Sequence, residues 1–190
     1  MVRDSKFFVR VTPEACMLAA LILLVIPLKW VLAWIAAALW HELFHCLALL
    51  LCGYPVHGLT IGINGAQIST DILSDSECLI CGLAGPAGGL LLLLLSGMFP
   101  RMAVCALLQS VFNLLPVYPL DGGQALRGLT RLLLPERWAQ GICTAVEIVV
   151  VVIAVCFGLA LHFLYRVEIL PAILIVCFLV QMKKRKIPCK

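Results

Sequence analysis

The sequence predicts an all-α polytopic membrane protein with about six transmembrane helices, a proline-broken fourth helix and a short re-entrant β-hairpin after the second helix. Of its 190 residues, 63% are hydrophobic and only 13% are charged, and the mean hydropathy of +1.10 exceeds that of soluble domains. Long apolar runs recur along the whole chain. If these runs span a membrane, most of the basic residues fall on one side of it. We therefore expect a single intramembrane domain over residues 1–190, without a soluble accessory domain.

The hydropathy pattern predicts where these helices lie. The first apolar run follows three basic residues, as in a signal peptide, but no small-x-small cleavage site follows Leu28, so we interpret the run as a helix. The predicted spans lie near residues 13–28, 30–52, 78–99, 102–120, 141–165 and 167–182.

The basic residues predict the orientation. Of the 14 Lys and Arg residues, all fall on one side of the six predicted spans except Lys29, Arg101 and Arg166. The positive-inside rule then places both termini in the cytoplasm. No basic stripe with interleaved aromatic residues accompanies the net charge of +4. We therefore expect the lipid bilayer as a partner, and no nucleic acid.

Most of the ten cysteines lie inside apolar runs, where we interpret them as reduced packing residues. Cys78 and Cys81 form one CxxC pair, and no second pair completes a zinc site with them.

His41, Glu42 and His45 form an HExxH motif inside an apolar run. Histidines four residues apart project from one helix face and can reach the same metal ion, with Glu42 beside that face. The alternative is a set of core residues that form hydrogen bonds between helices. Three ionisable groups within five residues of a membrane interior need a common compensating partner, and a metal ion supplies one. We therefore predict that His41 and His45 are metal ligands.

Asp121 is the candidate third ligand, because a catalytic zinc usually has three protein ligands and a carboxylate can complete the set. Pro116 and Pro119 interrupt the helix that leads to it, and a Gly-Gly pair follows it. Irregular backbone at membrane depth is tolerated where it is buried in protein or lines a water-filled cavity. The alternative is a simple helix-ending turn. If the second and fourth spans run in the same direction, the aspartate and both histidines can meet in the inner half of the membrane.

The segment of residues 56–70 predicts a β-hairpin, because apolar residues alternate on both sides of Asn64-Gly65, a pair typical of a type I′ turn. An exposed strand here could hold an extended substrate by strand addition, with Asn64 and Gly65 at the substrate-binding edge. The alternative is a re-entrant loop that only plugs the helix bundle.

Two other ionisable residues stand out. Glu147 lies in the fifth predicted span, where an ionisable group suggests a function, although it could also face lipid head groups or Arg137. His57 lies in the hairpin segment, and we interpret it as a surface or gating residue rather than a ligand.

The two motifs together, HELFH and then NLLPVYPLDGG about 70 residues later, resemble those of the site-2 protease family of intramembrane zinc metalloproteases. The chain is most similar to the bacterial branch of the stage IV sporulation protein FB, and the resemblance covers roughly residues 30–130. It implies that one Zn²⁺ is bound by His41, His45 and Asp121, with Glu42 as the catalytic glutamate. It also implies that Asn113 helps to position the substrate.

Two departures from the family pattern concern the packing on the substrate side. Phe44 stands where a glycine is common in the HExxH motif. GPAGG, at residues 85–89, stands where members of the family often have an asparagine a few residues after Gly-Pro. Neither departure changes a predicted ligand.

The resemblance implies a zinc metalloendopeptidase of the bacterial cell membrane that hydrolyses a peptide bond in or near a transmembrane segment. The substrate would be a membrane-associated protein such as a pro-sigma factor or another regulatory precursor in sporulation. Zinc would activate water and polarise the scissile carbonyl, and Glu42 would be the general base. Regulation would come from a partner membrane protein.

Two other functions stay open. The first is a catalytically inactive module that binds membrane proteins, which the intact motifs argue against. The second is a small metal transporter in which the three ligands form a transit site. A transit site has no specific need for an unligated base, so Glu42 argues against this function.

Overall fold

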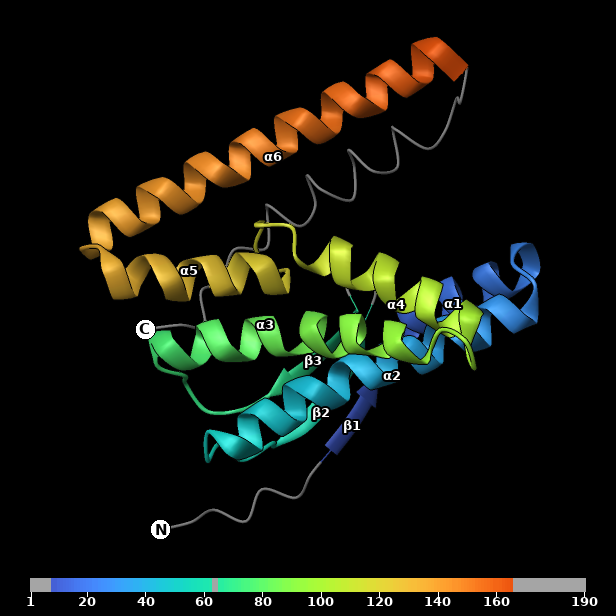
Figure 1. The fold of residues 1–190 in the computed structure, drawn as a ribbon, viewed down its shortest axis with the longest axis horizontal. Helices are drawn as coiled ribbons and strands as arrows, with labels where there is room; N and C mark the ends of the chain where they lie inside the picture. The colour runs from blue at the N-terminus through green and yellow to red at the C-terminus, as the bar shows by residue number, and fades with distance from the viewer. Residues whose placement is uncertain (1–7, 63–64, 166–190) are drawn as a thin grey trace. The chain divides into compact units, whose positions relative to one another are not determined.

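The computed structural model describes residues 8–62 and 65–165, which form a mostly helical chain with one three-stranded sheet (Figure 1). The strands are β1 (Phe8–Val11), β2 (Gly58–Gly62) and β3 (Gly65–Ser69). The helices are α1 (Pro13–Val25), α2 (Leu28–Leu51), α3 (Asp75–Leu91), the short 3₁₀ helix η1 (Leu92–Leu95), α4 (Pro100–Asn113), α5 (Asp121–Leu133) and α6 (Glu136–Tyr165).

The chain divides into two compact units. The first unit consists of Met1–Ile72 and Ala84–Phe112, and the second consists of Leu73–Leu83 and Asn113–Lys190. Helix α3 contributes its N-terminal half to the second unit and its C-terminal half to the first.

Within the described ranges, three helical stretches are long and apolar enough to cross a membrane: Leu28–Leu51, Asp75–Leu95 and Glu136–Ala160. They correspond to the second, third and fifth predicted spans. Helix α1 is apolar but has only 13 residues. The sixth predicted span, at 167–182, lies outside the described residues. The three long apolar helices support the conclusion that this is a membrane protein.

The fourth predicted helix is shorter than expected. The prediction of one span over 102–120 is wrong, because α4 ends at Asn113 and the chain is irregular until α5 begins at Asp121. Pro116 and Pro119 explain the gap, since proline has no N–H to donate and disfavours helical backbone in the residue before it. The proline break is thus present, but it starts earlier than predicted.

Helix α5 was not predicted. Its charged residues lower its hydropathy, so a search for apolar runs passes over it. The helix is strongly two-sided, because leucines are exposed on one face while small residues are buried on the other. The buried face consists of Gly122, Gly123, Ala125, Gly128 and Thr130.

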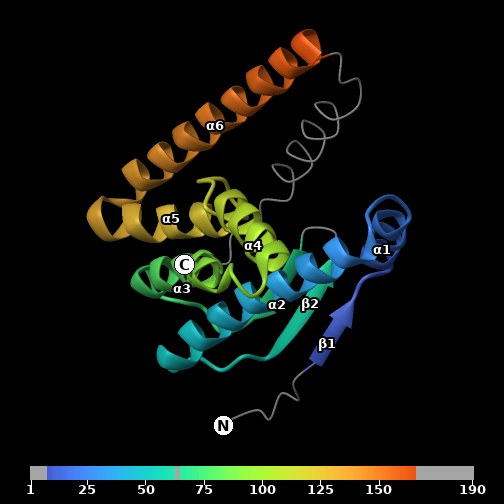
Figure 2. The same cartoon turned by 45° about the vertical axis from the view of Figure 1, so that its right-hand side comes forward.

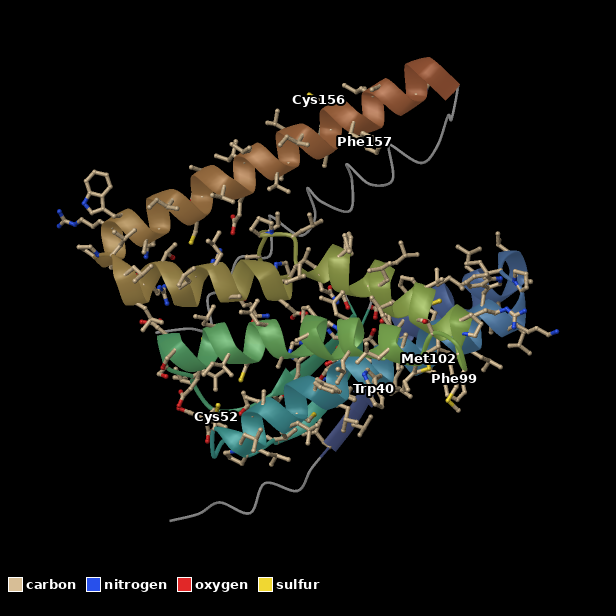
Figure 3. The ribbon with its side chains drawn as sticks, viewed as in Figure 1. Trp40, Cys52, Phe99, Met102, Cys156 and Phe157 are labelled. Atoms are coloured by element: carbon tan, nitrogen blue, oxygen red, sulfur yellow. The ribbon has the colours of Figure 1, made fainter. Side chains whose placement is uncertain are left out.

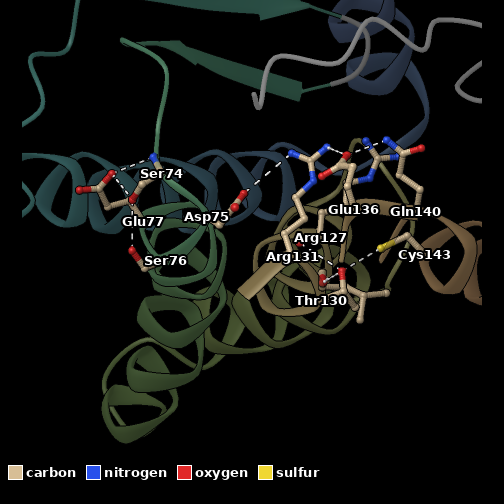
Figure 4. A network of polar contacts seen from close by, with 11 residues as sticks. Ser74, Asp75, Ser76, Glu77, Arg127, Thr130, Arg131, Glu136, Gln140 and Cys143 are labelled. Atoms are coloured by element: carbon tan, nitrogen blue, oxygen red, sulfur yellow. Dashed lines mark hydrogen bonds and ion pairs between the residues drawn. The ribbon is translucent and has the colours of Figure 1, made fainter. Parts of the chain in front are cut away.

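Two helix starts follow from local capping. Thr12 Oγ1 accepts a hydrogen bond from Ala15 N at 3.4 Å, and Pro13 occupies the first turn of α1. At the start of α3, Ser74 N and Ser74 Oγ both donate to Glu77 Oε2, at 2.8 and 2.6 Å (Figure 4). Because of this cap, α3 begins a few residues before the predicted residue 78.

The sheet confirms the predicted hairpin and adds a strand to it. β2 and β3 pair antiparallel, from Gly58↔Ser69 to Gly62↔Gly65. β1 lies parallel to β2, from Phe8↔Gly58 to Val11↔Ile61, so the sequence analysis missed this third strand (Figure 2). The predicted type I′ turn at Asn64-Gly65 falls partly on residues 63–64, which lie outside the described residues. Gly65 itself opens β3 with a φ of +96°.

Polar contacts close the base of the hairpin. His57 N donates to Ser69 O at 2.8 Å, and Thr70 Oγ1 donates to Pro55 O at 2.9 Å. His57 Nε2 lies 3.0 Å from Asp71 Oδ1. His57 is therefore a partly exposed residue that links the two ends of the hairpin.

The helices of the first unit pack through small residues and side chains that bond to backbone. Ala37, Leu92, Cys105 and Ala106 form a core, on which Trp40 and Met102 pack (Figure 3). Trp40 Nε1 donates to Gly88 O at 2.8 Å, and Gln109 Nε2 donates to Trp34 O at 3.0 Å. These bonds satisfy polar side chains that would otherwise be costly inside a bilayer.

Gly88 and Phe44 fit each other. A Cβ atom on Gly88 would overlap the ring of Phe44, whose centroid lies 5.5 Å from that of the Trp40 ring at an interplanar angle of 42°. Gly88→Ala should therefore lower the stability of the folded protein by about 2 kcal/mol through overpacking. Thermal unfolding in detergent measures this change, and the Tm of Gly88→Ala should be lower than that of the wild type.

Gly97→Ala is the matched control, because a Cβ there meets nothing within 4 Å. Adding Phe44→Ala to Gly88→Ala should remove the overlap. An unchanged Tm in Gly88→Ala would contradict this packing.

Candidate metal centre

His41 and His45 present their ring nitrogens to one point on α2. The two Nε2 atoms lie 3.1 Å apart, and the ring centroids are separated by 4.8 Å. His41 is only 4% exposed, and His45 is half-buried. The predicted convergence of the two imidazoles on one helix face is confirmed.

This arrangement fits a shared zinc ion. Zinc binds histidine nitrogen at about 2.0–2.1 Å with tetrahedral angles, so two such nitrogens lie about 3.3 Å apart. The observed 3.1 Å separation of the Nε2 atoms is close to that value. The two histidines can therefore become ligands of one ion with little rearrangement.

Gly85 leaves room beside these nitrogens. A Cβ at Gly85 would overlap His45 Nε2 and would lie 2.6 Å from His41 Nε2. Both histidines and this part of α3 belong to the first unit. A glycine is thus required where the backbone of α3 passes the imidazoles.

Glu42 is half-buried and follows His41 on α2, inside the helix that is apolar enough to cross a membrane. A glutamate in this position lies beside the two histidines and can exchange a proton with a water molecule there. Its role as general base stays a prediction.

Asp121 belongs to the second unit, where it is the first residue of α5 and half-buried. Close backbone packing fixes its position in that unit. A Cβ on Gly82 of α3 would lie 2.9 Å from Asp121 O, and one on Gly122 would overlap Leu114 O. A carboxylate here is favoured by the positive end of the helix dipole.

The segment that leads to Asp121 is held by a charged cluster. Glu147 Oε1 accepts a hydrogen bond from Arg127 Nη2 at 3.0 Å and from Tyr118 N at 3.4 Å. The guanidinium carbon of Arg127 lies 4.1 Å from the centroid of the Tyr118 ring. The sequence singled out Glu147 but neither of its partners, because no local pattern pairs residues so far apart.

A second polar network lies one turn further along α5 (Figure 4). Arg131 Nη2 donates to Glu136 Oε1 at 3.1 Å, and Arg131 Nη1 lies 3.8 Å from Asp75 Oδ1. Thr130 Oγ1 lies 3.3 Å from Cys143 Sγ. These contacts join α3, α5 and α6 within the second unit.

The predicted substrate-binding residues occupy different elements. Asn113 is the last residue of α4 and is half-buried. Gly65 is exposed at the start of β3, and Asn64 lies outside the described residues. β3 is an edge strand in the order β1-β2-β3 of the described sheet. A role for any of these residues in substrate binding stays a prediction.

The cysteines in the described ranges are free; Cys105 and Cys143 are buried, whereas Cys16 and Cys156 are exposed. Cys78 and Cys81 are buried within α3.

No protein-family model matches this sequence, and no curated protein matches it. Its structure is similar to that of the site-2 protease from Methanocaldococcus jannaschii, with a TM-score of 0.69 and 17% sequence identity. The similarity covers 100% of this chain and 96% of that one. At this level of identity the likeness concerns the fold, so the chain has a fold like that of a site-2 protease.

Proposed function

We propose that this protein is an intramembrane zinc metalloendopeptidase of the site-2 protease type, which hydrolyses a peptide bond in or near a transmembrane segment of a membrane-associated protein. The observation that carries the proposal is the 3.1 Å approach of His41 Nε2 and His45 Nε2 within an HExxH motif on an apolar helix. The likeness to a solved site-2 protease supports it independently.

We propose His41, His45 and Asp121 as the ligands of one Zn²⁺. Two imidazoles and a carboxylate are a donor set of catalytic zinc sites. When bound, the ion would act as a Lewis acid on the scissile carbonyl and would lower the pKa of water. Support for Asp121 comes from its position in the LDG motif and from the backbone packing that fixes it.

Glu42 is the proposed general base. Its carboxylate would take the proton of the attacking water and return it to the amine of the departing peptide. Apolar residues of α2 flank it, and a surrounding of low dielectric constant would strengthen the interaction of the carboxylate with charge that develops during the reaction.

The substrate must be extended before it can be cut, because a helix hides its peptide bonds in intrahelical hydrogen bonds. We propose that the edge strand β3, which begins at Gly65, receives the extended segment by strand addition, and that Gly65 and the preceding residue Asn64 contact the substrate. Asn113 would bind the substrate backbone near the ligand segment.

The cellular setting extends the same proposal. We propose about six spans in a bacterial cell membrane, with both termini in the cytoplasm. We also propose that the chain belongs to the stage IV sporulation protein FB branch and that its substrate is a pro-sigma factor or a similar precursor. Support comes from the distribution of basic residues and from the motif resemblance. A regulatory membrane protein would associate with the enzyme. Co-purification from native membranes tests this association, and a chain that is recovered alone and fully active would contradict it.

Zinc content separates the ligands from the base. Purified wild type should contain about one zinc ion per chain, and Asp121→Ala should bind zinc roughly 100-fold more weakly, because a ligand is lost. Glu42→Gln should keep its zinc but should hydrolyse a library of transmembrane peptides about 10²–10⁴-fold more slowly, because the base is lost. Elemental analysis and peptide cleavage check these outcomes.

Each alternative function gives a different pattern in the same experiment. If the protein is a transporter, Glu42→Gln and wild type should carry metal across the membrane of proteoliposomes equally well. An inactive binding module should cleave no peptide in either form. Tight zinc binding by Asp121→Ala would show that the third ligand lies elsewhere.

Gly85→Ala tests the space beside the histidines. The higher helix propensity of alanine favours the substitution by about 0.5–1 kcal/mol, but the overlap of its Cβ with the ring of His45 opposes it. Because the new methyl group would meet both ring nitrogens, zinc affinity should fall by about tenfold or more. Chelator competition measures this change.

Gly141→Ala on α6 is the control, since a Cβ there meets nothing within 4 Å. It should leave zinc affinity unchanged. Equal zinc affinity of Gly85→Ala and wild type would contradict the proposed position of the ion.

Strand addition predicts where the substrate contacts the enzyme. In the Glu42→Gln background, a photo-crosslinking residue at Gln67 on β3 should link to a transmembrane peptide that the wild type cleaves. The same residue at the exposed Arg137 serves as the control and should not link. Equal crosslinking at both positions, measured by mass spectrometry, would rule against binding at β3.

A further inference from the structure

Glu147 is a buried carboxylate that the proposed reaction does not use. It lies in α6, within the stretch Glu136–Ala160 that is apolar enough to cross a membrane, and it is only 5% exposed. A buried charge at such a position is costly unless it is paired and hydrogen-bonded. Glu147 therefore needs partners within the fold, and these partners indicate its role.

The contacts of Glu147 join three segments of the second unit. One oxygen, Oε1, accepts from Arg127 Nη2 at 3.0 Å and from the backbone N–H of Tyr118 at 3.4 Å. Arg127 in turn lies over the Tyr118 ring, with its guanidinium carbon 4.1 Å from the ring centroid. We call Tyr118, Arg127 and Glu147 the clamp; it ties α5 and α6 to the irregular segment between α4 and α5.

The clamp acts close to the proposed ligand. Tyr118 precedes Asp121 by three residues, and Arg127 follows it on the same helix. Leu120 N donates to Val117 O at 2.9 Å, and a Cβ on Gly123 would lie 2.5 Å from Tyr118 N. Because the chain between Tyr118 and Asp121 is this short and tightly packed, a displacement of Tyr118 should move Asp121 as well.

The two charged residues of the clamp, Arg127 and Glu147, pair with each other. Arg127 borders a cavity of about 130 Å³ together with Arg131, Thr130 and Gln140. Arg127 pairs there with Glu147, and Arg131 pairs with Glu136. The guanidinium groups are thus already balanced by carboxylates, which favours a positioning role over capture of an anion from solution.

We propose that Glu147 and Arg127 are positioning residues that fix the Tyr118 segment and thereby orient the Asp121 carboxylate for metal binding. This inference rests on the proposed function for the metal and on the contacts of the second unit for the clamp. Neither residue touches the substrate or the reacting atoms in this account.

A matched pair of variants tests the clamp. Glu147→Gln and Glu136→Gln each remove a carboxylate of α6 that pairs with an arginine of α5, but only Glu147 also accepts from Tyr118 N. The readouts are the hydrogen exchange rate of the Tyr118 amide, the rate of zinc loss to a chelator, and Tm. Glu147→Gln should raise the first two rates by about tenfold, whereas Glu136→Gln should leave them unchanged.

A second variant separates positioning from stability. The double variant Arg127→Met with Glu147→Leu replaces the buried ion pair by apolar side chains of similar size, a change that is often neutral for stability. Its Tm should stay within a few degrees of wild type, while the Tyr118 amide exchanges faster and zinc is lost faster, by about tenfold each.

The outcomes distinguish this inference from the proposed function. Wild-type exchange and zinc-loss rates in the double variant would overturn the clamp, even if zinc content and peptide hydrolysis agree with a protease. Absence of zinc from the wild type would instead overturn the proposed function. In that case the exchange rate of the Tyr118 amide alone would decide whether the clamp holds its segment.

Discussion

Two imidazole nitrogens held 3.1 Å apart on an apolar helix are the constraint on which the first unit depends. Lipid penalises such groups, so the helices around α2 must provide partners for them, and a metal ion is the proposed partner of the two histidines. Gly85 leaves space here, since its missing side chain lets α3 pass the histidines. The indole N–H of Trp40 donates a hydrogen bond to Gly88 O, and Phe44 packs against Gly88. Phe44 and Gly88 of the GPAGG segment thus pack against each other.

The second unit depends on a different interaction, a buried ion pair that holds irregular backbone. The prolines that end α4 leave a segment without helical hydrogen bonds. Glu147 accepts a hydrogen bond from the backbone N–H of Tyr118 in this segment. Gly122 and Gly123 of α5 have no side chain, so the carbonyl groups of the segment can lie against the α5 backbone. Charge and backbone packing therefore fix the position of Asp121, the first residue of α5, because the segment that leads to it is not helical.

The sequence predicted those features that have a local signal. Four-residue spacing predicted the convergence of His41 and His45, alternation predicted the β2–β3 hairpin, and Pro116 with Pro119 predicted a break before Asp121. Features that depend on distant pairing were missed. β1 has four residues, and its partner strand lies some 50 residues away, so neither its length nor its neighbours signalled a sheet. The clamp likewise needs the tertiary fold, because Arg127 and Glu147 come from different helices. Whether Asp121 completes the ligand set stays a prediction that the sequence motif and its chemistry support.

The most direct test of this account is X-ray absorption spectroscopy of the zinc-loaded wild-type protein, because it reports which atoms bind the metal. We expect nitrogen and oxygen ligands at about 2.0–2.2 Å from the zinc, with the outer-shell signature of two imidazole rings. Cys46 lies next to His45 in the sequence, so sulfur ligation is a real competitor. A zinc–sulfur distance of about 2.3 Å, or a shell without imidazole, would contradict the central claim that His41 and His45 hold the catalytic zinc.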